Sequence, residues 1–310
     1  MKAMAIVQYG EPDVLTLTDL PVPAPAAGEV RVRVHAVSIN PVDYKRRRSG
    51  DFAPFPVVLG WDVSGVIDAL APGVTDFAVG DEVFGMIRFP REGRAYAEYV
   101  VAAATDLARK PPSLSHREAA ASTMAPLTAY QALDQMDLRA GQQILIHAAS
   151  GGVGHFAVQL AKARGAQVTA TGSAGNREFI LGLGADTFVD YRTQPFETQV
   201  SNFDAVLDTV GGDTFVRSFG VVRRGGWVVS IVTKPTDEHL ALAEQLGIHV
   251  AWIWVVPSRP QLEYLTSLLE AGQLRPHVSQ VFALEQVAKA HRAQESGRTV
   301  GKIVLDVIQG

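Results

Sequence analysis

The first third of the chain shows the alternation of apolar and polar residues that is typical of β-strands. Residues 30–34 read Val-Arg-Val-Arg-Val, which predicts a strand with one buried face. Further short strands are predicted at 63–70 and 96–101, and the proline and glycine residues between them predict turns. No long helix is predicted before Ser115. We therefore expect an antiparallel barrel or sandwich in this part of the chain.

From about residue 115 the pattern changes to strands that alternate with helices. Ser115 is predicted to cap a helix that contains Glu118. A further helix is predicted through Arg164, and apolar runs predict strands at 143–148, 167–171, 187–191, 203–209, 227–232 and 249–255. Alternation at this spacing is typical of βαβ units, so the middle of the chain is predicted to form a doubly wound parallel sheet of the α/β class.

The end of the chain is expected to return to the first domain. A helix is predicted at 259–271 and a strand at 301–307, and this last strand resembles those of the first third. A chain of 310 residues suits two domains. We predict one domain from residues 1–120 and 259–310, and a second from residues 121–258.

Composition excludes several classes of function. The net charge of -4 shows no basic bias toward nucleic acid or an anionic membrane, and the basic run 45–48 is interpreted as a solvated turn. The absence of cysteine excludes disulfides, thiolate catalysis and thiolate zinc sites. The start of the chain lacks the apolar core of a signal peptide, and no apolar stretch approaches the roughly 20 residues that span a bilayer. We expect a cytoplasmic protein.

A glycine-rich run between a predicted strand and a predicted helix indicates a dinucleotide site. Gly151 would let the backbone approach a pyrophosphate, and Gly154 would let the helix pack tightly on the strand. The start of the helix offers N–H groups to phosphates. Ala149 replaces the first glycine of the usual fingerprint, and a glycine-rich turn without a ligand is the alternative. The predicted contacts are Ala149, Ser150, Gly151, Gly152, Val153 and Gly154.

The segment after the second strand of this unit indicates which nucleotide binds. Sites for NAD normally carry Asp or Glu about 20 residues after the glycines, but residues 169–177 contain no acid. Ser173 and Arg177 suit a 2′-phosphate, because a guanidinium pairs with phosphate through two hydrogen bonds. We predict NADPH as the cofactor. The alternative for Arg177 is a surface arginine in the first turn of the next helix.

Several motifs along the chain together resemble one protein family, the zinc-independent quinone oxidoreductase branch of the medium-chain dehydrogenase/reductase superfamily, which includes alkenal reductases. The resemblance covers essentially the whole chain. It implies a GroES-like β-barrel catalytic domain, a Rossmann domain, and an active site in the cleft between them. Besides the glycine-rich run, the motifs lie at 38–43, 59–65, 79–83, 183–186, 208–212 and 301–305.

Departures from the zinc enzymes of this superfamily predict that no metal is bound. Those enzymes carry a Cys near Ser38, a His-Glu pair where this chain has Trp61 and Asp62, and a third ligand around Ala125. None of these ligands is present, the four-cysteine structural lobe is missing, and the eight histidines show no ligand spacing.

The resemblance also implies roles for individual residues. Ser173, Arg177 and Tyr191 match the residues that meet the 2′-phosphate in NADPH quinone reductases, and Arg298 matches a basic residue near the C-terminus. Asn40 and Asp43 match the Asn-x-x-Asp of the substrate pocket. A tyrosine that some quinone reductases place shortly afterwards is Phe52 here. Further expected cofactor contacts are Thr128, Val210, Gly211, Ser230 and Ile231.

The predicted reaction is hydride transfer from NADPH to a quinone or an α,β-unsaturated carbonyl. Such an acceptor delocalises the negative charge, so hydrogen-bond donors can replace a metal. Asn40, Tyr44 and Lys45 are the candidate donors, with Asp43 orienting them, and local turn structure is the alternative for each. Two other functions stay open: an enoyl-thioester reductase, indicated only by the basic run 45–48, and a non-catalytic NADPH-binding sensor.

The apolar run 248–255 predicts how the chain assembles. It reads as the last strand of the parallel sheet, and a long apolar edge invites pairing. We expect a homodimer in which this strand pairs with its own copy about a two-fold axis. The alternative is a strand covered within its own subunit.

Overall fold

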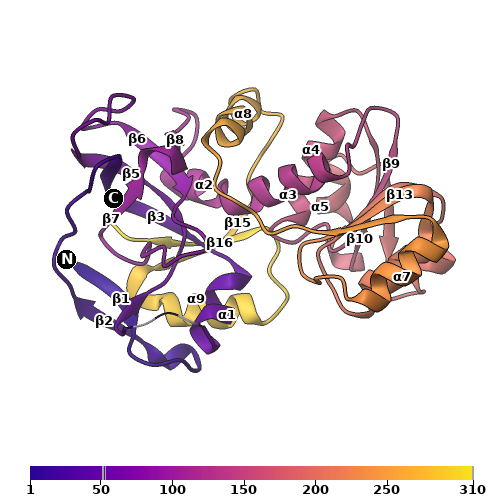
Figure 1. The fold of residues 1–310 in the computed structure, drawn as a ribbon, viewed down its shortest axis with the longest axis horizontal. Helices are drawn as coiled ribbons and strands as arrows, with labels where there is room; N and C mark the ends of the chain where they lie inside the picture. The colour runs from indigo at the N-terminus through magenta and orange to yellow at the C-terminus, as the bar shows by residue number, and fades with distance from the viewer. Residues whose placement is uncertain (51, 53, 309–310) are drawn as a thin grey trace. The chain divides into compact units, whose positions relative to one another are not determined.

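The computed structural model describes residues 1–50, 52 and 54–308 (Figure 1). The chain forms two compact units, one from Met1–Leu127 together with Val256–Gly310 and the other from Thr128–Val255. Each unit has its own sheets and its own buried core.

The first unit is built on a seven-stranded sheet, which runs in the order β15-β16-β3-β5-β6-β8, with β7 also paired to β3. Along β3 the residues Val30, Val32 and Val34 are fully buried while Arg33 is exposed, which confirms the predicted strand. The strands are β3 (Glu29–Ile39), β5 (Asp62–Leu70), β6 (Glu82–Met86), β7 (Tyr99–Ala103), β8 (Leu107–Arg109), β15 (Val278–Ala283) and β16 (Lys302–Asp306).

The C-terminal strand completes this sheet, as the sequence predicts. β16 pairs antiparallel with β3, so that Ile303 lies opposite Ile39. Helix α2 (His116–Ala121) packs against both strands through a small apolar cluster of alanines and Val304. The predicted cap of α2 is confirmed, because Ser115 Oγ accepts the Glu118 N–H and the Glu118 carboxylate accepts the Ser115 N–H.

Several elements of the first unit are absent from the sequence prediction. A small antiparallel sheet has the order β2-β1-β4, and two helices pack on each other, α1 and α9. The helix predicted at 259–271 is present as α8 (Arg259–Glu270). The bounds are β1 (Lys2–Ile6), β2 (Leu15–Asp19), β4 (Val57–Val58), α1 (Pro41–Arg48) and α9 (Val287–Glu295), with short 3-10 helices at Pro12–Val14, Ala104–Asp106 and Leu284–Gln286.

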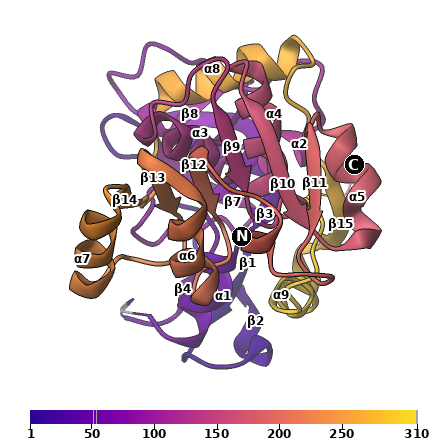
Figure 2. The ribbon, with the colours of Figure 1, turned by 90° about the vertical axis from the view of Figure 1, so that its right-hand side faces the viewer.

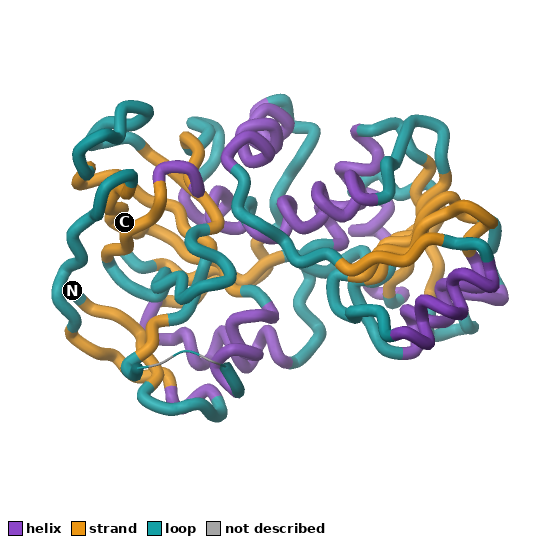
Figure 3. The backbone as a smooth tube through the Cα atoms, viewed as in Figure 1, coloured by secondary structure: helices purple, strands orange, loops and turns teal. Residues whose placement is uncertain are grey.

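The second unit is a doubly wound parallel sheet, which confirms the predicted α/β class. Its six strands run side by side in the order β11-β10-β9-β12-β13-β14 (Figure 2), and helices lie on both sides of them (Figure 3). The strands are β9 (Gln143–Ile146), β10 (Gln167–Gly172), β11 (Thr187–Asp190), β12 (Phe203–Asp208), β13 (Val222–Ser230) and β14 (His249–Trp252).

The helices of the second unit connect these strands. One face of the sheet is packed by an apolar core in which Leu145, Val206 and Val228 meet Phe215 and Phe219. The helices are α3 (Met124–Gln135), which begins in the first unit, α4 (Gly154–Ala163), α5 (Arg177–Gly182), α6 (Asp213–Arg217) and α7 (Asp237–Leu246), with 3-10 helices at Ala174–Asn176, Phe196–Thr198 and Ser218–Val221. None of the helices in the described ranges is long and apolar enough to cross a bilayer.

Candidate functional site

The glycine-rich turn joins β9 to α4 and leaves no room for a side chain where the helix begins. A Cβ at Gly154 would lie 2.4 Å from the carbonyl oxygen of Ala148 and 2.8 Å from the Cα of Ala149. Gly154 therefore packs directly against the turn that precedes the helix, and its predicted role in helix–strand packing stays a prediction. The left-handed φ of this turn falls on Ala148, at 45°, and not on Ala149, which is fully buried. An alanine can therefore stand where the usual fingerprint has its first glycine.

Hydrogen bonds from two neighbouring strands fix this turn. The Ala148 N–H donates to Thr171 Oγ1 (3.2 Å) at the end of β10, and Thr209 Oγ1, just after β12, donates to the His147 carbonyl (2.7 Å). The His155 N–H, in the first turn of α4, donates to the Gly151 carbonyl (3.1 Å), and the start of the helix carries the positive end of its dipole. The turn thus fits the pyrophosphate of a dinucleotide, because bare backbone at Gly151 and Gly152 leads directly into a helix N-terminus.

Two of the three residues predicted to meet the 2′-phosphate, Ser173 and Tyr191, lie where β10 and β11 end, and the third, Arg177, begins α5. Gly172 pairs with Asp190 in the parallel register, so Ser173 and Tyr191 are the next residues of adjacent strands. Tyr191 is half exposed, and Arg177 is the exposed first residue of α5, with its guanidinium 5.4 Å from the centre of the Phe188 ring.

Asn176 is a functional candidate that the sequence reasoning missed. Its Nδ2 donates to Ser150 Oγ (2.9 Å) and to Ser173 Oγ (3.4 Å). It therefore ties the glycine-rich turn to the segment that follows β10. Only its place within the acid-free stretch 169–177 could have drawn attention to it.

The loops after β12 and β13 are braced by one buried carboxylate. Asp208 Oδ1 accepts the N–H groups of Val210 (3.0 Å) and Gly211 (2.9 Å), and Oδ2 accepts the Ser230 hydroxyl (2.7 Å). The Ile231 N–H donates to the Asp208 carbonyl (3.1 Å). Asp208 thus holds four of the predicted cofactor contacts together, although the sequence indicates it only as part of the motif 208–212.

Two further predicted cofactor residues lie elsewhere. Thr128 is largely buried in α3, at the start of the second unit. Arg298 belongs to the first unit, where it is exposed in the turn between α9 and β16, and its N–H donates to Ser296 Oγ (3.2 Å).

In the first unit, the side chain of Asn40 is held from both ends. Its Nδ2 donates to Asp62 Oδ2 (2.8 Å), and its Oδ1 accepts a hydrogen bond from Lys302 Nζ (2.5 Å). Asn40 is only 4% exposed. One N–H of its amide is therefore taken, and the prediction that Asn40 donates to a substrate rests on the second.

Asp43 is fully buried in the first turn of α1, where its Oδ2 accepts the Asn40 N–H (2.6 Å). The pKa of Asp43 is raised to about 7. Burial is the main cause and the charge of Asp62 adds to it, while hydrogen bonds from Asn40 and Tyr96 and the charge of Lys302 oppose the shift. Tyr44 is half-buried and Lys45 is exposed on the same helix.

At the positions that carry metal ligands in the zinc enzymes, the side chains of this chain pack in the core or donate hydrogen bonds to backbone carbonyls. Ser38 Oγ donates to the Ile303 carbonyl (3.4 Å), Trp61 is fully buried with its Nε1 donating to the Arg91 carbonyl (2.6 Å), and Ala125 is buried. Within the described ranges, no three His, Asp or Glu side chains gather as a metal site would require.

Comparison with known proteins gives matches over the whole chain. Residues 26–112 match the alcohol dehydrogenase GroES-like domain, and residues 183–305 match the family described as zinc-binding dehydrogenase. A 2-methylene-furan-3-one reductase of Solanum lycopersicum is 35% identical over 99% of this chain and 79% of its own length. The mitochondrial NAD(P)H oxidoreductase RTN4IP1 of Danio rerio is 33% identical, covering 100% of this chain and 92% of its own.

Solved structures of related oxidoreductases also match the whole chain. The quinone oxidoreductase from Coxiella burnetii superposes with a TM-score of 0.95 at 36% identity, covering 99% of each chain. The chain belongs to the zinc-independent quinone oxidoreductase branch of the medium-chain dehydrogenase/reductase superfamily. A quinone oxidoreductase of Escherichia coli, solved in complex with NADPH, superposes with a TM-score of 0.90 at 28% identity, covering 99% of this chain and 100% of that one.

Membership of this branch confirms the GroES-like and Rossmann domains and makes the chain an NAD(P)H oxidoreductase that uses a nicotinamide cofactor. The relative from Danio rerio is named as mitochondrial, and a quinone-oxidoreductase homolog of Spinacia oleracea, 32% identical over 98% of this chain and 99% of its own length, is named as chloroplastic. A cytoplasmic location for this member of the branch stays a prediction.

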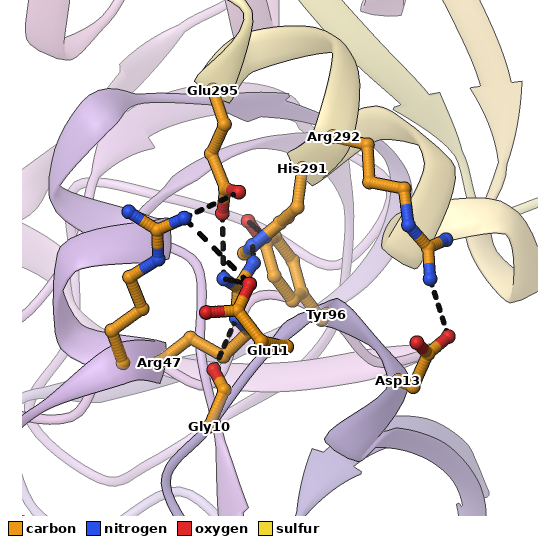
Figure 4. Close-up of polar contacts among 9 residues, drawn as sticks. Gly10, Glu11, Asp13, Arg47, Tyr96, His291, Arg292 and Glu295 are labelled. Carbon is orange, nitrogen blue, oxygen red and sulfur yellow. Dashed lines mark hydrogen bonds and ion pairs between the residues drawn. The ribbon is translucent and has the colours of Figure 1, made fainter.

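The basic run of this oxidoreductase is not a solvated turn, so that interpretation was wrong. Residues 45–48 lie in α1, and Arg47 is fully buried (Figure 4). Its Nε donates to the Gly10 carbonyl (2.9 Å), and its guanidinium is 2.6 Å from Glu295 Oε1 on α9. Arg48, which is 48% exposed, contacts the other oxygen of the same carboxylate (3.0 Å). The negative charge of Glu295 compensates the buried charge of Arg47.

His291 links this ion pair to Asp43, and neither His291 nor Tyr96 was singled out from the sequence. A nitrogen of Arg47 lies 3.1 Å from His291 Nδ1, and His291 Nε2 lies 3.0 Å from the Tyr96 hydroxyl (Figure 4). Arginine can only donate, so Nδ1 accepts and the proton of the neutral ring is on Nε2. Burial and Arg47 lower the pKa of His291 to about 3, which keeps it neutral. The Tyr96 O–H is then free to donate to Asp43.

Proposed function

We propose that this chain is a metal-free reductase that transfers hydride from NADPH to quinones or α,β-unsaturated carbonyls. The observation that carries the proposal is that Ser173 and Tyr191 directly follow the adjacent strands β10 and β11, with Arg177 at the start of α5. Residues 169–177, which include Ser173 and Arg177, contain no acid. Bound NADPH would supply the hydride. The glycine-rich turn would hold its pyrophosphate, and the loops braced by Asp208 would line the rest of the nucleotide.

The preference for NADPH is tested by Arg177→Ala. A charge-assisted hydrogen bond to phosphate contributes about 1.5–3 kcal/mol, so the ratio of the NADH and NADPH dissociation constants should fall roughly 10- to 100-fold. Arg223→Ala is the control, because Arg223 pairs with Asp204 near the opposite ends of the strands. Equal dissociation constants for the two cofactors in the unchanged protein would refute the preference.

Conjugated acceptors are proposed because the candidate donors are modest. Reduction of a plain ketone leaves a localised alkoxide, which usually needs a metal or a strong acid. An enone or quinone spreads the charge, and the second N–H of Asn40, the Tyr44 hydroxyl and the Lys45 ammonium would suffice as donors, with Asp43 holding the start of α1. An enone should be reduced much faster than its saturated ketone. Similar rates would contradict the proposal.

The contacts of the basic run weaken the case for an enoyl-thioester reductase. That alternative relies on the positive charge of residues 45–48, but Arg47 is buried and both Arg47 and Arg48 pair with Glu295. A non-catalytic sensor is separated by assay: it would bind NADPH and oxidise none of it with a panel of quinones and enones.

The exposed edge of the parallel sheet supports a homodimer through residues 248–255. β14 is the last strand of the sheet, Trp252 and Trp254 have ring centres 5.3 Å apart, and Trp254 is 43% exposed. Trp254→Lys should convert the dimer to a monomer in sedimentation experiments. Val281→Lys, on the exposed edge strand β15 of the first unit, should leave it intact. A monomeric natural chain at micromolar concentration would contradict the proposal.

A further inference from the structure

A lysine ammonium is buried at the start of β16. Lys302 is 3% exposed, and its Nζ donates to the Ile39 carbonyl (2.7 Å) and to Asn40 Oδ1 (2.5 Å). A lysine is almost never fully buried unless its charge is compensated. Its burial therefore requires a group of opposite charge nearby.

The compensating charge is supplied through Asn40. Asp62 is fully buried, and its carboxylate accepts Asn40 Nδ2 (2.8 Å) and the Met124 N–H (3.1 Å). The amide of Asn40 thus lies between an ammonium, which can only donate, and a carboxylate, which can only accept. Its orientation is fixed by this chemistry, since a flipped amide would point N–H at N–H and oxygen at oxygen.

This network joins four segments that are far apart in sequence. Lys302 comes from β16, Asp62 from β5 and Met124 from the start of α3, while Asn40 immediately precedes α1. Helix α1 carries Tyr44 and Lys45, the other candidate donors. The side chain of Asn40, and with it the residue that precedes α1, is therefore held by a charge that lies outside this segment.

We propose that Lys302 is a positioning residue for reduction of the acceptor. It acts through Asn40 and Asp62, which fix the start of α1 and the direction of the second Asn40 N–H. This inference rests on the proposed function. A small displacement of positioned donors lowers turnover strongly, so loss of Lys302 should reduce kcat between roughly 10- and 100-fold.

The first test compares Lys302→Met with Lys110→Met. Lys110 is also buried in the first unit, where its Nζ donates to the carbonyls of Pro111 (3.1 Å) and Leu114 (2.6 Å). Both variants remove a buried ammonium, and both should lower the denaturant midpoint. Only Lys302→Met should lower kcat with a quinone acceptor, while the dissociation constant for NADPH stays within about twofold of its natural value. Equal losses of kcat in the two variants would overturn the proposal.

The second test separates positioning from charge balance, and it also covers failure of Lys302→Met to fold. The double variant with Lys302→Met and Asp62→Asn removes the buried ammonium and one of the two buried carboxylates near it, while Asp43 remains, so its stability should recover in part. Its kcat should stay low, because Asn40 is no longer held between two charges. Recovery of kcat together with stability would show that Lys302 has only a structural role. A natural chain that reduces no quinone or enone would refute the proposed function itself, which is a different result.

Discussion

Replacing Arg47 with methionine should destabilise the first unit far more than the same change at its neighbour Arg48. Both arginines pair with Glu295, so the two substitutions share this partner and differ in burial and in the further contacts of Arg47. Arg47 is fully buried and also donates to the Gly10 carbonyl and to His291, whereas Arg48 is 48% exposed.

The magnitude follows from what each substitution leaves behind. Removing one partner of a buried ion pair typically costs about 3–5 kcal/mol, because the other charge remains uncompensated. Glu295 would keep its contact with Arg48 (3.0 Å), so its charge stays partly compensated. Arg47→Met also leaves the Gly10 carbonyl and His291 Nδ1 without their donor, and we expect a total cost of about 3 kcal/mol. An exposed ion pair contributes about 0–1 kcal/mol, which sets the expectation for Arg48→Met.

The assay is urea unfolding, together with hydrogen exchange of the amides in α1 and α9. Arg47→Met should lower the unfolding midpoint clearly and speed exchange in both helices, since the substitution removes the buried contacts of α1 with Glu295 and His291 on α9. Arg48→Met should do neither to a comparable extent. If the two variants lose stability within about 0.5 kcal/mol of each other, burial does not control the contribution of these pairs and the reasoning fails.

Two further predictions concern packing and pH. Gly154→Ala should cost about 1–3 kcal/mol of stability and weaken NADPH binding, because its Cβ meets the Ala148 carbonyl. Gly182→Ala at the end of α5, with open space around its Cβ, should do neither. Thermal melts and nucleotide titration check this, and equal melting points would contradict it. Burial lowers the pKa of His116 from an ordinary 6.5 to about 4. Between these two pH values the unfolded chain binds more protons than the folded chain. The free energy of unfolding should therefore fall as the pH drops from 6.5 to 4, by up to about 1.4 kcal/mol per pH unit for this group. Urea midpoints at several pH values should show a shallower fall for His116→Gln, and an unchanged slope would argue against it.

The sequence predicted the second unit well because its signals are local. Apolar runs placed its strands to within a few residues, as in β12 (Phe203–Asp208) against the expected 203–209. The glycine-rich turn could be read because a tight strand-to-helix connection makes the same demands in any chain. The acid-free stretch after β10 was equally local.

Helix α1 was missed because it has no apolar periodicity. Its sequence is mostly charged, and it is held by the local capping contact of Asp43 with Asn40 together with the tertiary contacts of the buried Arg47. The buried polar residues were missed for a related reason. Lys302 reaches Asn40 across 262 positions and Tyr96 reaches His291 across 195, and no pattern in a short window can report such a contact.

The late position of β16 in the chain affects the order in which the protein can fold during synthesis. The second unit is continuous, so all of Thr128–Val255 has left the ribosome before β16 is made. At about 5–20 residues per second, the first 127 residues wait roughly 10–35 s for Lys302 to be made. During that time Ala36–Ile39 of β3 is an open strand edge, and the charge of Asp62 has no counterpart. An open edge is prone to pair with other chains, so the nascent first unit is the part of this protein that most needs a chaperone.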